Sequence, residues 1–346
     1  MRSSQERHRA VTAGERSSAM RAQTITRRNV LKFASLLPLA TLIRPRAATV
    51  GAPADTFPVS RRYRVTAVVS LFSVPLFTRH DAGGAYAALE RSSRGTEATL
   101  ALQFCAGTLP QRVHGLNRFG FQQEQIIEQN GEARESAELG FITSCPENDF
   151  EQARNSLFAA ASKLGCAVAR ASYTRDRRVF ALEHFSLPST YSWANSSEVQ
   201  DKIRANPPAL KDPVPGSAPE ERPWPFLYAI HRAMISPRQP FQTTFLHNAE
   251  RSLLETTSHS DPRTGRVLKA QGVVKDESAV VMLAGFVRSA RGQKSSEFRV
   301  WFESGAADAV PLRIEFRPRS FLHLVFEHDP STGGPQIASL MSQETM

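Results

Sequence analysis

The sequence FQQEQIIEQNGEARESAELGFIT, residues 121–143, predicts a β-hairpin and thereby indicates an antiparallel β fold. At its centre lies Asn130-Gly131, and these residue types best tolerate the positive φ that both central positions of a type I′ turn require. The flanking segments 121–129 and 132–143 are therefore predicted to be antiparallel strands joined by a tight turn.

Further strands are expected on both sides of this hairpin. Arg62–Thr78 is dominated by Val, Phe, Leu, Tyr and Thr, which predicts one long strand that bends at Pro75 and ends before a chain break at Gly83-Gly84. Short turns, including Asp261–Gly265, separate consecutive strands, so neighbouring strands must be antiparallel. The other predicted strands are 85–92, 97–107, 166–173, 179–187, 241–247, 251–259, 266–275, 279–288, 297–303, 310–317 and 322–327.

Helices are predicted at three places. Ser144-Cys145-Pro146-Glu147 fits a capping box and starts a helix over residues 146–164, which Gly165 is expected to end. Shorter helices are expected at 196–204 and 226–235. Residues 206–225 contain seven prolines, which fix φ and donate no ladder hydrogen bond, so this stretch is a linker or long surface loop.

Together these elements predict a mainly β (β-rich α+β) protein. We expect an antiparallel curved sheet or incomplete barrel with a few helices. This β domain spans residues 55–329, is interrupted by the proline-rich linker at 206–225, and is followed by a flexible tail at 330–346. One continuous sheet is favoured over two independent domains.

The N-terminal segment has the pattern of a twin-arginine export signal. Arg27 and Arg28 precede Asn29-Val30-Leu31-Lys32, and an eleven-residue apolar run, 33–43, follows. That run is too short for a bilayer core, which needs about 20 apolar residues, so no transmembrane anchor is expected after cleavage. The interpretation that competes with export is a buried N-terminal helix with a chance Arg-Arg pair.

Ala52-Pro53-Ala54 has the small-x-small spacing of a signal peptidase site, which predicts cleavage after Ala54 and a signal peptide over residues 1–54. Ala48 is the alternative cleavage site. Met20 would give a leader of more usual length, so either Met1 or Met20 is the initiator. The predicted location is the periplasm.

The positive charge of the chain belongs to this leader. The formal net charge is +10, yet residues 1–48 contain ten Arg or Lys and two Glu, so the remainder has 33 basic and 31 acidic residues. A nearly neutral mature protein has no electrostatic basis for binding nucleic acid, which we therefore exclude as a partner.

The three cysteines, Cys105, Cys145 and Cys166, do not form a disulfide framework, because their number is odd and the domain is large enough to fold without one. Folding before export takes place in a reducing compartment. We expect buried free thiols, with one late disulfide as the first alternative and a catalytic thiol as the second.

No short catalytic, nucleotide-binding or zinc-binding motif occurs. The histidines, His323 among them, lack the spacing that aims two imidazoles at one metal, so neither a metal nor another cofactor is expected. Two arginine clusters, 175–178 and 313–319, could bind phosphate or carboxylate groups, but charges that protect strand edges explain them better. Trp193, Trp224 and Trp301 could line a sugar or lipid surface, although packing explains them as well.

The C-terminal part resembles a bacterial exported family known as domain of unknown function 3108. The resemblance rests on Val300-Trp301-Phe302-Glu303, on Val310–Phe316 and on the strand 321–326, with weaker likeness at Tyr63–Phe77 and Phe226–Ile235. It covers about 60% of the mature chain. It implies an envelope-associated antiparallel β fold and carries no established activity or catalytic residues.

Two functional hypotheses follow. The first is a non-catalytic periplasmic protein that binds a lipid, a glycan or an envelope protein on its curved sheet. The alternative is an envelope hydrolase or lyase with an acid/base pair gathered from several strands, in a deep pocket where titratable side chains converge.

Overall fold

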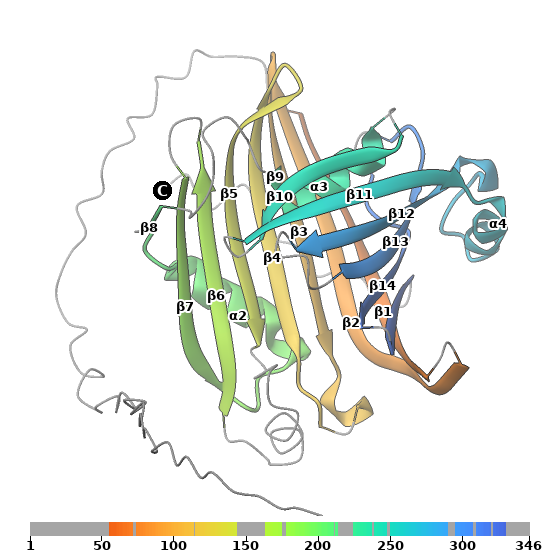
Figure 1. The fold of residues 1–346 in the computed structure, drawn as a ribbon, viewed down its shortest axis with the longest axis horizontal. Helices are drawn as coiled ribbons and strands as arrows, with labels where there is room; N and C mark the ends of the chain where they lie inside the picture. Colours follow the sequence, from red (N-terminus) through yellow and green to blue (C-terminus); the bar gives the residue numbers. More distant parts are fainter. Residues whose placement is uncertain are drawn as a thin grey trace, which may run out of the picture. The chain divides into compact units, whose positions relative to one another are not determined.

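The computed structural model describes residues 55–71, 74–113, 115–143, 163–174, 178–210, 212–213, 224–236, 239–247, 250–289, 295–306, 309–319 and 321–329. Their strands form one sheet (Figure 1). In chain order they are β1 (Asp55–Leu71), β2 (Val74–Arg94), β3 (Glu97–Thr108), β4 (Phe119–Gln129), β5 (Glu132–Thr143), β6 (Lys163–Tyr173), β7 (Arg178–Pro188), β8 (Asp212–Pro213), β9 (Trp224–Pro225), β10 (Phe241–His247), β11 (Glu250–Ser260), β12 (Val280–Ser289), β13 (Ser295–Glu303), β14 (Arg313–Arg319) and β15 (Leu322–His328).

The strand order is β8-β7-β6-β5-β4-β3-β2-β1-β15-β14-β13-β12-β11-β10-β9. Every pairing is antiparallel except that between β9 and β10. The described residues of the two edge strands, β8 and β9, do not pair with each other, so the sheet is open. Residues 214–223 of the proline-rich stretch connect these edges. The predicted fold class, an antiparallel curved sheet with a few helices, is confirmed.

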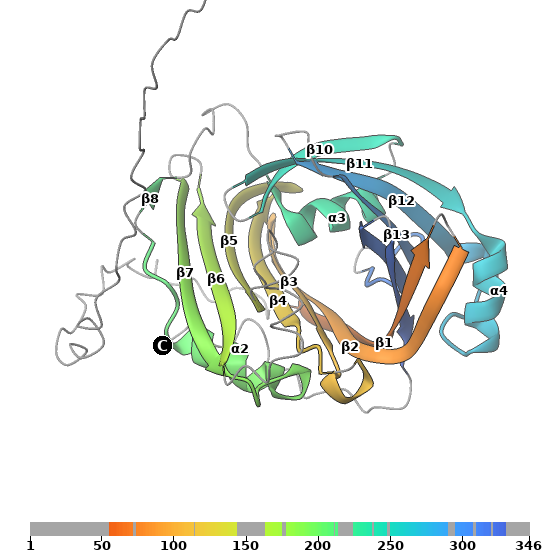
Figure 2. The ribbon, with the colours of Figure 1, turned by 60° about the horizontal axis from the view of Figure 1, so that its bottom comes forward.

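Within the described residues, three α-helices accompany the sheet: α2 (Ser196–Ala205), α3 (Phe226–Ile235) and α4 (Pro262–Ala270). The sheet curls around α3, whereas α2 and α4 lie on its outer side (Figure 2). Short 3-10 helices occur at Pro110–Arg112, Trp193–Asn195 and Glu277–Ala279. The predicted helices at 196–204 and 226–235 are therefore confirmed as α2 and α3.

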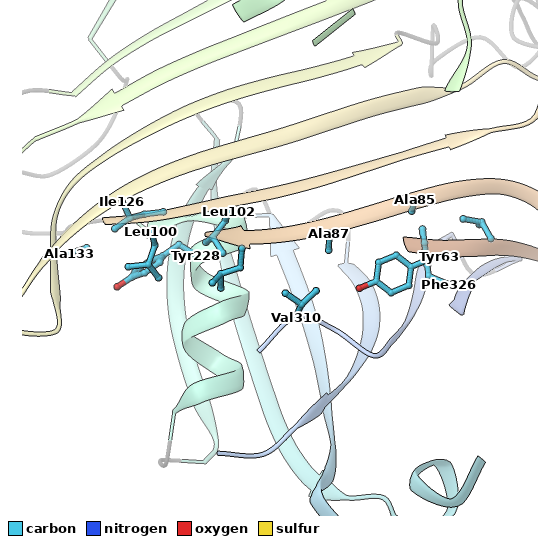
Figure 3. Close-up of a cluster of buried hydrophobic side chains, with 12 residues drawn as sticks. Tyr63, Ala85, Ala87, Leu100, Leu102, Ile126, Ala133, Tyr228, Val310 and Phe326 are labelled. Carbon is cyan, nitrogen blue, oxygen red and sulfur yellow. The ribbon is translucent and has the colours of Figure 1, made fainter. Parts of the chain in front are cut away.

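The inner side of the curl holds most of the hydrophobic core. Leu100 and Ile126 of β3 and β4 lie beside Tyr228 of α3, and Tyr63 of β1 lies near Phe326 at the other end of the same cluster (Figure 3). A second inner cluster packs the other side of α3 against β10–β13. Burying this helix between two parts of one sheet explains why the sheet curls rather than staying flat, because apolar surface is removed from water on both sides of α3.

The hairpin at residues 121–143 is confirmed. Asn130 and Gly131 have φ of 55° and 77°, as a type I′ turn requires. The pairing begins with Gln129 opposite Glu132, and the register shifts by one residue between Ile127 and Glu128. This shift is a β-bulge, and it determines which side chains of β4 and β5 face each other.

The prediction of one long strand over 62–78 is wrong. β1 ends at Leu71 and pairs back with β2, with Leu71 opposite Val74, so the chain turns sharply there. The break expected at Gly83-Gly84 is also wrong, because β2 continues through both glycines. The irregularity lies just before them, where the register shifts between Val65 and Ala67 and Asp81 has a φ of 53°.

The strand predicted at 266–275 is also wrong, because residues up to 270 belong to α4. Asp261 is the N-cap of this helix, and its side chain accepts a hydrogen bond from the Thr264 N–H. Pro262 occupies the first helical turn. The predicted turn at 261–265 is therefore the start of a helix, since an Asp-Pro pair suits both structures.

The limits of two other expected elements differ from the prediction. Leu164 and Gly165 belong to β6 and not to the end of a helix, and the rest of the predicted helix at 146–164 lies outside the described residues except for Lys163. The strand expected at 310–317 begins at Arg313. The signal peptide at 1–54 and the tail at 330–346 also lie outside the described residues.

Candidate functional site: an apolar cavity on the inner face of the sheet

A cavity of about 420 Å³ lies on the inner side of the curl, on strands β1–β7 and β15. Its lining is dominated by apolar side chains and glycines, with Arg118 as the one charged residue among the described lining residues. The residues that line it include Val65, Phe104, Ala106, Arg118, Gly120, Gln122, Gly140, Ile142, Ala167, Ala169, Leu182, Leu324 and Phe326.

The cavity exists because small residues face each other across four strands. Ala106 pairs with Gly120, and Gly140 pairs with Ala169 on the next strands. Successive residues of a strand point to opposite faces, so these small residues share the inner face with Phe104 and Gln122. The described residues leave a cavity beside them, and we call this group the small-residue ladder (Ala106, Gly120, Gly140, Ala167 and Ala169).

Gly120 and Gly140 each lie close to a neighbouring group. A Cβ on Gly120 would come within 2.6 Å of the carbonyl oxygen of Phe141. A Cβ on Gly140 would come within 2.6 Å of the Gln122 side-chain oxygen. A larger residue at Gly120 would therefore distort the sheet, whereas at Gly140 it would displace the flexible Gln122 side chain.

One side of the cavity is open to solvent through apolar side chains. Ile142 and Leu182 line the cavity and keep 58% and 47% of their surface exposed, respectively. Exposed apolar groups next to an apolar cavity are typical of a ligand-binding site, since a ligand removes both from water.

A second, smaller cavity of about 230 Å³ lies between α3 and the strands on either side of it. Phe104 and Phe326 line both cavities, and their ring centroids are 5.9 Å apart in an edge-on arrangement. The two cavities are therefore separated by one aromatic pair. His231 lines the smaller cavity, and no described residue forms a hydrogen bond with its Nε2.

His231 is held in the uncharged form. Burial, together with the nearby charges of Arg91 and Arg232, lowers the pKa of His231 to about 4. The wall of the smaller cavity therefore presents a neutral imidazole at physiological pH, and a neutral imidazole can donate or accept one hydrogen bond.

Two buried carboxyl groups, Glu124 of β4 and Glu138 of β5, lie next to the cavities. They are direct cross-strand partners, and the Gln122 amide lies 3.3 Å from Glu124 Oε1 and 3.4 Å from Glu138 Oε2. Glu124 accepts hydrogen bonds of 2.8 Å from the backbone N–H groups of both Leu227 and Tyr228. It therefore caps the start of α3 from across the interior.

Burial raises the pKa of both carboxyl groups. The pKa of Glu124 rises to about 7, although its hydrogen bonds to α3 oppose the shift. For Glu138, burial is again the main cause and the charge of Glu124 adds to it, so its pKa lies well above the usual range. The pair consequently holds at least one proton near neutral pH.

A second group of buried polar side chains lies around Glu128, and Tyr228 near the start of α3 belongs to it. The Tyr228 hydroxyl donates a hydrogen bond to Glu128 of β4. Arg91 and Arg232 lie 3.9 Å and 3.8 Å from the same carboxylate. Glu128 is thus a paired, buried charge that fixes α3 against β4.

The residues that the sequence singled out do not meet at this cavity. Arg27, Arg28 and Ala54 lie outside the described residues, as do Arg175, Arg177 and Cys145. Cys105 and Cys166 are buried free thiols, and burial raises the pKa of Cys105 to about 12 and that of Cys166 to about 11. Among the described part of the chain, no group of three or more His, Cys, Asp or Glu side chains is arranged to hold a metal ion.

The predicted arginine cluster at 313–319 forms ion pairs within β14 and with the two neighbouring strands. Arg313 contacts Glu315 at 2.9 Å and Glu327 at 3.0 Å, and Arg317 lies 3.4 Å from Glu297. These ion pairs give the two arginines a structural role, but the predicted role in protecting a strand edge is wrong, because β14 pairs with β13 on one side and β15 on the other.

The tryptophans also have packing roles. Trp301 donates a hydrogen bond of 2.8 Å to Asp261, and Trp224 packs on Tyr228 with ring centroids 5.0 Å apart. Trp193 packs on the outer face of the sheet, against Tyr86.

Sequence reasoning missed the ladder and the carboxyl pair. Glycines inside strands, at 120 and 140, were the available signal, because a strand glycine marks a close approach or a hollow.

Within the described ranges, no helix is both long enough and apolar enough to cross a bilayer.

Comparisons with known proteins identify no family. No protein-family model matches the chain, and no curated protein matches it. Among solved structures, the chain is similar to a beta-barrel-like protein of domain of unknown function DUF1849 from Brucella abortus. The two are 10% identical, and the match covers 79% of this chain and 95% of that one with a TM-score of 0.36. The resemblance to domain of unknown function 3108 stays a prediction.

Proposed function

We propose that this protein is an exported, non-catalytic periplasmic protein that binds an apolar ligand with the chemistry of a lipid acyl chain. The observation that carries the proposal is the cavity of about 420 Å³ above the small-residue ladder. Its volume falls in the range of about 300–1,000 Å³ that small-molecule sites occupy. The twin-arginine pattern at Arg27 and Arg28 supports the location.

The lining favours a hydrocarbon over a glycan. A sugar would leave its hydroxyl groups without partners against Phe104, Leu324 and Phe326, and each buried hydroxyl without a hydrogen bond costs about 1–3 kcal/mol. A flexible chain also suits two cavities that one aromatic pair separates, because rotation of Phe104 or Phe326 would join them.

An envelope hydrolase or lyase is the second candidate, and the Glu124–Glu138 pair is what favours it. Two carboxyl groups with raised pKa values are what acid/base chemistry needs. Neither residue lines the large cavity, however, and both oxygens of Glu124 accept hydrogen bonds from α3. The pair therefore has a structural task already, and binding without catalysis is the better supported function.

The test is displacement of the apolar fluorophore N-phenyl-1-naphthylamine by palmitate, measured with the wild-type protein and with Ala169→Trp. Ala169 faces the cavity and is half-buried, so an indole there fills the space with little effect on the core. We expect the variant to bind palmitate at least about tenfold more weakly, which corresponds to about 1.4 kcal/mol.

The matched control is Ala270→Trp, which places the same indole on an exposed position of α4. It should bind like the wild type. Equal palmitate affinity in all three proteins, with unchanged unfolding temperatures, would show that this cavity is not the binding site.

A further inference from the structure

A second pocket, of about 540 Å³, lies on the outer side of the sheet where α2 and the short helix before it cover β2 and β3. We propose that it is a separate binding site for an uncharged saccharide. Residues of β2 and β3 alternate between the two faces, so the side chains of Tyr86 and Gln103 point to the outer face, whereas Ala87 and Phe104 line the smaller inner cavity. The inference is independent of the proposed inner-face ligand.

An aromatic wall forms one side of this outer pocket. Trp193 and Tyr86 both line it, with ring centroids 6.2 Å apart and ring planes inclined at 45°. Trp193 lies directly on the backbone of β2 and β3: a Cβ on Gly84 would come within 2.6 Å of its Nε1, and one on Gly107 within 3.0 Å of its Cβ. The two glycines therefore fix the indole at the pocket.

The indole N–H has hydrogen-bonding capacity to spare. In the described part of the chain, no group accepts a hydrogen bond from Trp193 Nε1, and Trp193 is only half-buried. A tryptophan that served packing alone would be expected to bury its ring and satisfy this donor, as Trp301 does through Asp261.

Beneath the aromatic wall lies a rigid group of polar side chains. Gln103 and Gln200 are 3% and 2% exposed, and the Gln103 amide donates to Gln200 Oε1. The same oxygen accepts hydrogen bonds of 3.0 Å from both the Tyr86 hydroxyl and Arg204. Three hydrogen-bond donors converge on one acceptor, so a ligand with additional oxygen acceptors would improve the balance between donors and acceptors.

The charges at the pocket cancel. Arg62, Arg64 and Arg204 line it together with Asp81, Asp201 and Asp329. Arg204 is held by Asp201 at 3.1 Å and by Gln123 at 2.9 Å, so its charge is already neutralised. An anion would meet as many carboxylates as guanidinium groups, which excludes a phosphate site on simple electrostatics.

These features together match the chemistry of a sugar ring. The ring presents C–H groups on its face, which pack on an indole, and hydroxyl groups at its edge, which pair with amide, carboxylate and guanidinium groups. The outer pocket supplies both kinds of surface side by side. The inner cavity supplies only the first.

The test is saturation-transfer NMR with glucose, N-acetylglucosamine, maltose and chitobiose, each at about 1 mM, the range in which weak ligands are detected. We expect transfer to at least one disaccharide with the wild-type protein, and its loss in Gln103→Leu. Trp193→Phe keeps an aromatic ring in the packed position but removes the N–H, so it should weaken the signal without unfolding the protein.

Three controls make the outcome decisive. Gln271→Leu, an exposed change at the end of α4, and Ala169→Trp, in the inner cavity, should leave saccharide binding unchanged. Inorganic phosphate, titrated by calorimetry, should not bind at the outer pocket. Absence of transfer to all four sugars, transfer that survives both pocket variants, or phosphate binding that Arg204→Gln abolishes would each overturn the proposal.

Discussion

At the scale of single residues, the two buried carboxyl groups differ in their contacts with α3: Glu124 accepts hydrogen bonds from the helix, whereas no described hydrogen bond joins Glu138 to it. Glu124 accepts two backbone N–H groups at the start of the helix, where Pro225 provides no side-chain cap. A negative charge there is favourable because the helix N-terminus is positive. Glu138 makes no contact with α3 in the described hydrogen bonds, and its charge only repels that of Glu124.

This arrangement predicts how stability depends on pH. Because the pKa of Glu124 is raised to about 7 in the folded protein, the folded state binds more protons than the unfolded state between about pH 4.5 and 7. The contribution of Glu124 to the free energy of unfolding therefore falls as pH rises through this window, whereas the lowered pKa of His231 acts in the opposite direction between about pH 4 and 6.5 in every variant compared. In Glu138→Gln the repulsion is absent, so the fall should be smaller and the variant more stable than wild type at pH 8, by on the order of 1–3 kcal/mol.

Urea unfolding at pH 5 and pH 8 measures this difference. Glu135→Gln, on the exposed side of the same strand, is the matched control and should keep the wild-type pH dependence. If Glu138→Gln shows the same fall in stability between pH 5 and 8 as the wild type, the two carboxyl groups are not coupled.

The pairing of these two residues could not be predicted from the sequence. The Asn130-Gly131 turn was predictable, and it places Glu128 opposite Ala133. Continued without interruption, this register would place Glu124 opposite Ala137. The bulge after Ile127 moves the partner to Glu138, and a shift of one residue moves side chains to the other face.

At the scale of elements, α4 shows that one sequence signal can fit two structures. Asp261-Pro262 was interpreted as a turn between strands, yet the same residues cap a helix. The tertiary contact decides between them, because Trp301 of β13 donates to Asp261 and the apolar side of α4 covers this tryptophan. Local pattern alone does not contain that contact.

Asp261→Ala should therefore lose both the helix cap and the partner of a buried indole. Together these losses should lower the free energy of unfolding by about 2 kcal/mol. Asp276→Ala removes an exposed cap from a short 3-10 helix and should lower the free energy of unfolding by less than Asp261→Ala does. Thermal unfolding compares the two, and equal losses would contradict a special role for the Trp301 contact.

At the scale of the whole molecule, the strand pattern was sufficient to predict a curved antiparallel sheet. The position of α3 was not predictable, because it depends on packing between strands far apart in the sequence, and neither was the cavity, which side chains from strands β1–β7 and β15 line. The proline-rich segment 214–223 connects the two edges of the sheet. A two-residue strand at each edge limits the unpaired backbone that could pair with another molecule.

Export is a further whole-molecule prediction. Replacing Arg27 and Arg28 with lysine keeps the charge but removes the guanidinium pair, so the protein should disappear from the periplasmic fraction and remain in the cytoplasm. Arg21→Lys is the matched control. Immunoblotting of the two fractions gives the result, and unchanged periplasmic protein would contradict the twin-arginine prediction.

The most direct test of the central claim is native mass spectrometry of the protein isolated from its own periplasm, in wild-type and Ala169→Trp forms. If the cavity is filled, the wild-type protein should carry an additional mass. Organic extraction should release the bound molecule, and mass spectrometry of the extract should identify it as a molecule with an acyl chain. The same mass should be absent from Ala169→Trp. A wild-type protein that carries no such molecule, or a variant that carries as much of it, would contradict an inner-face binding site.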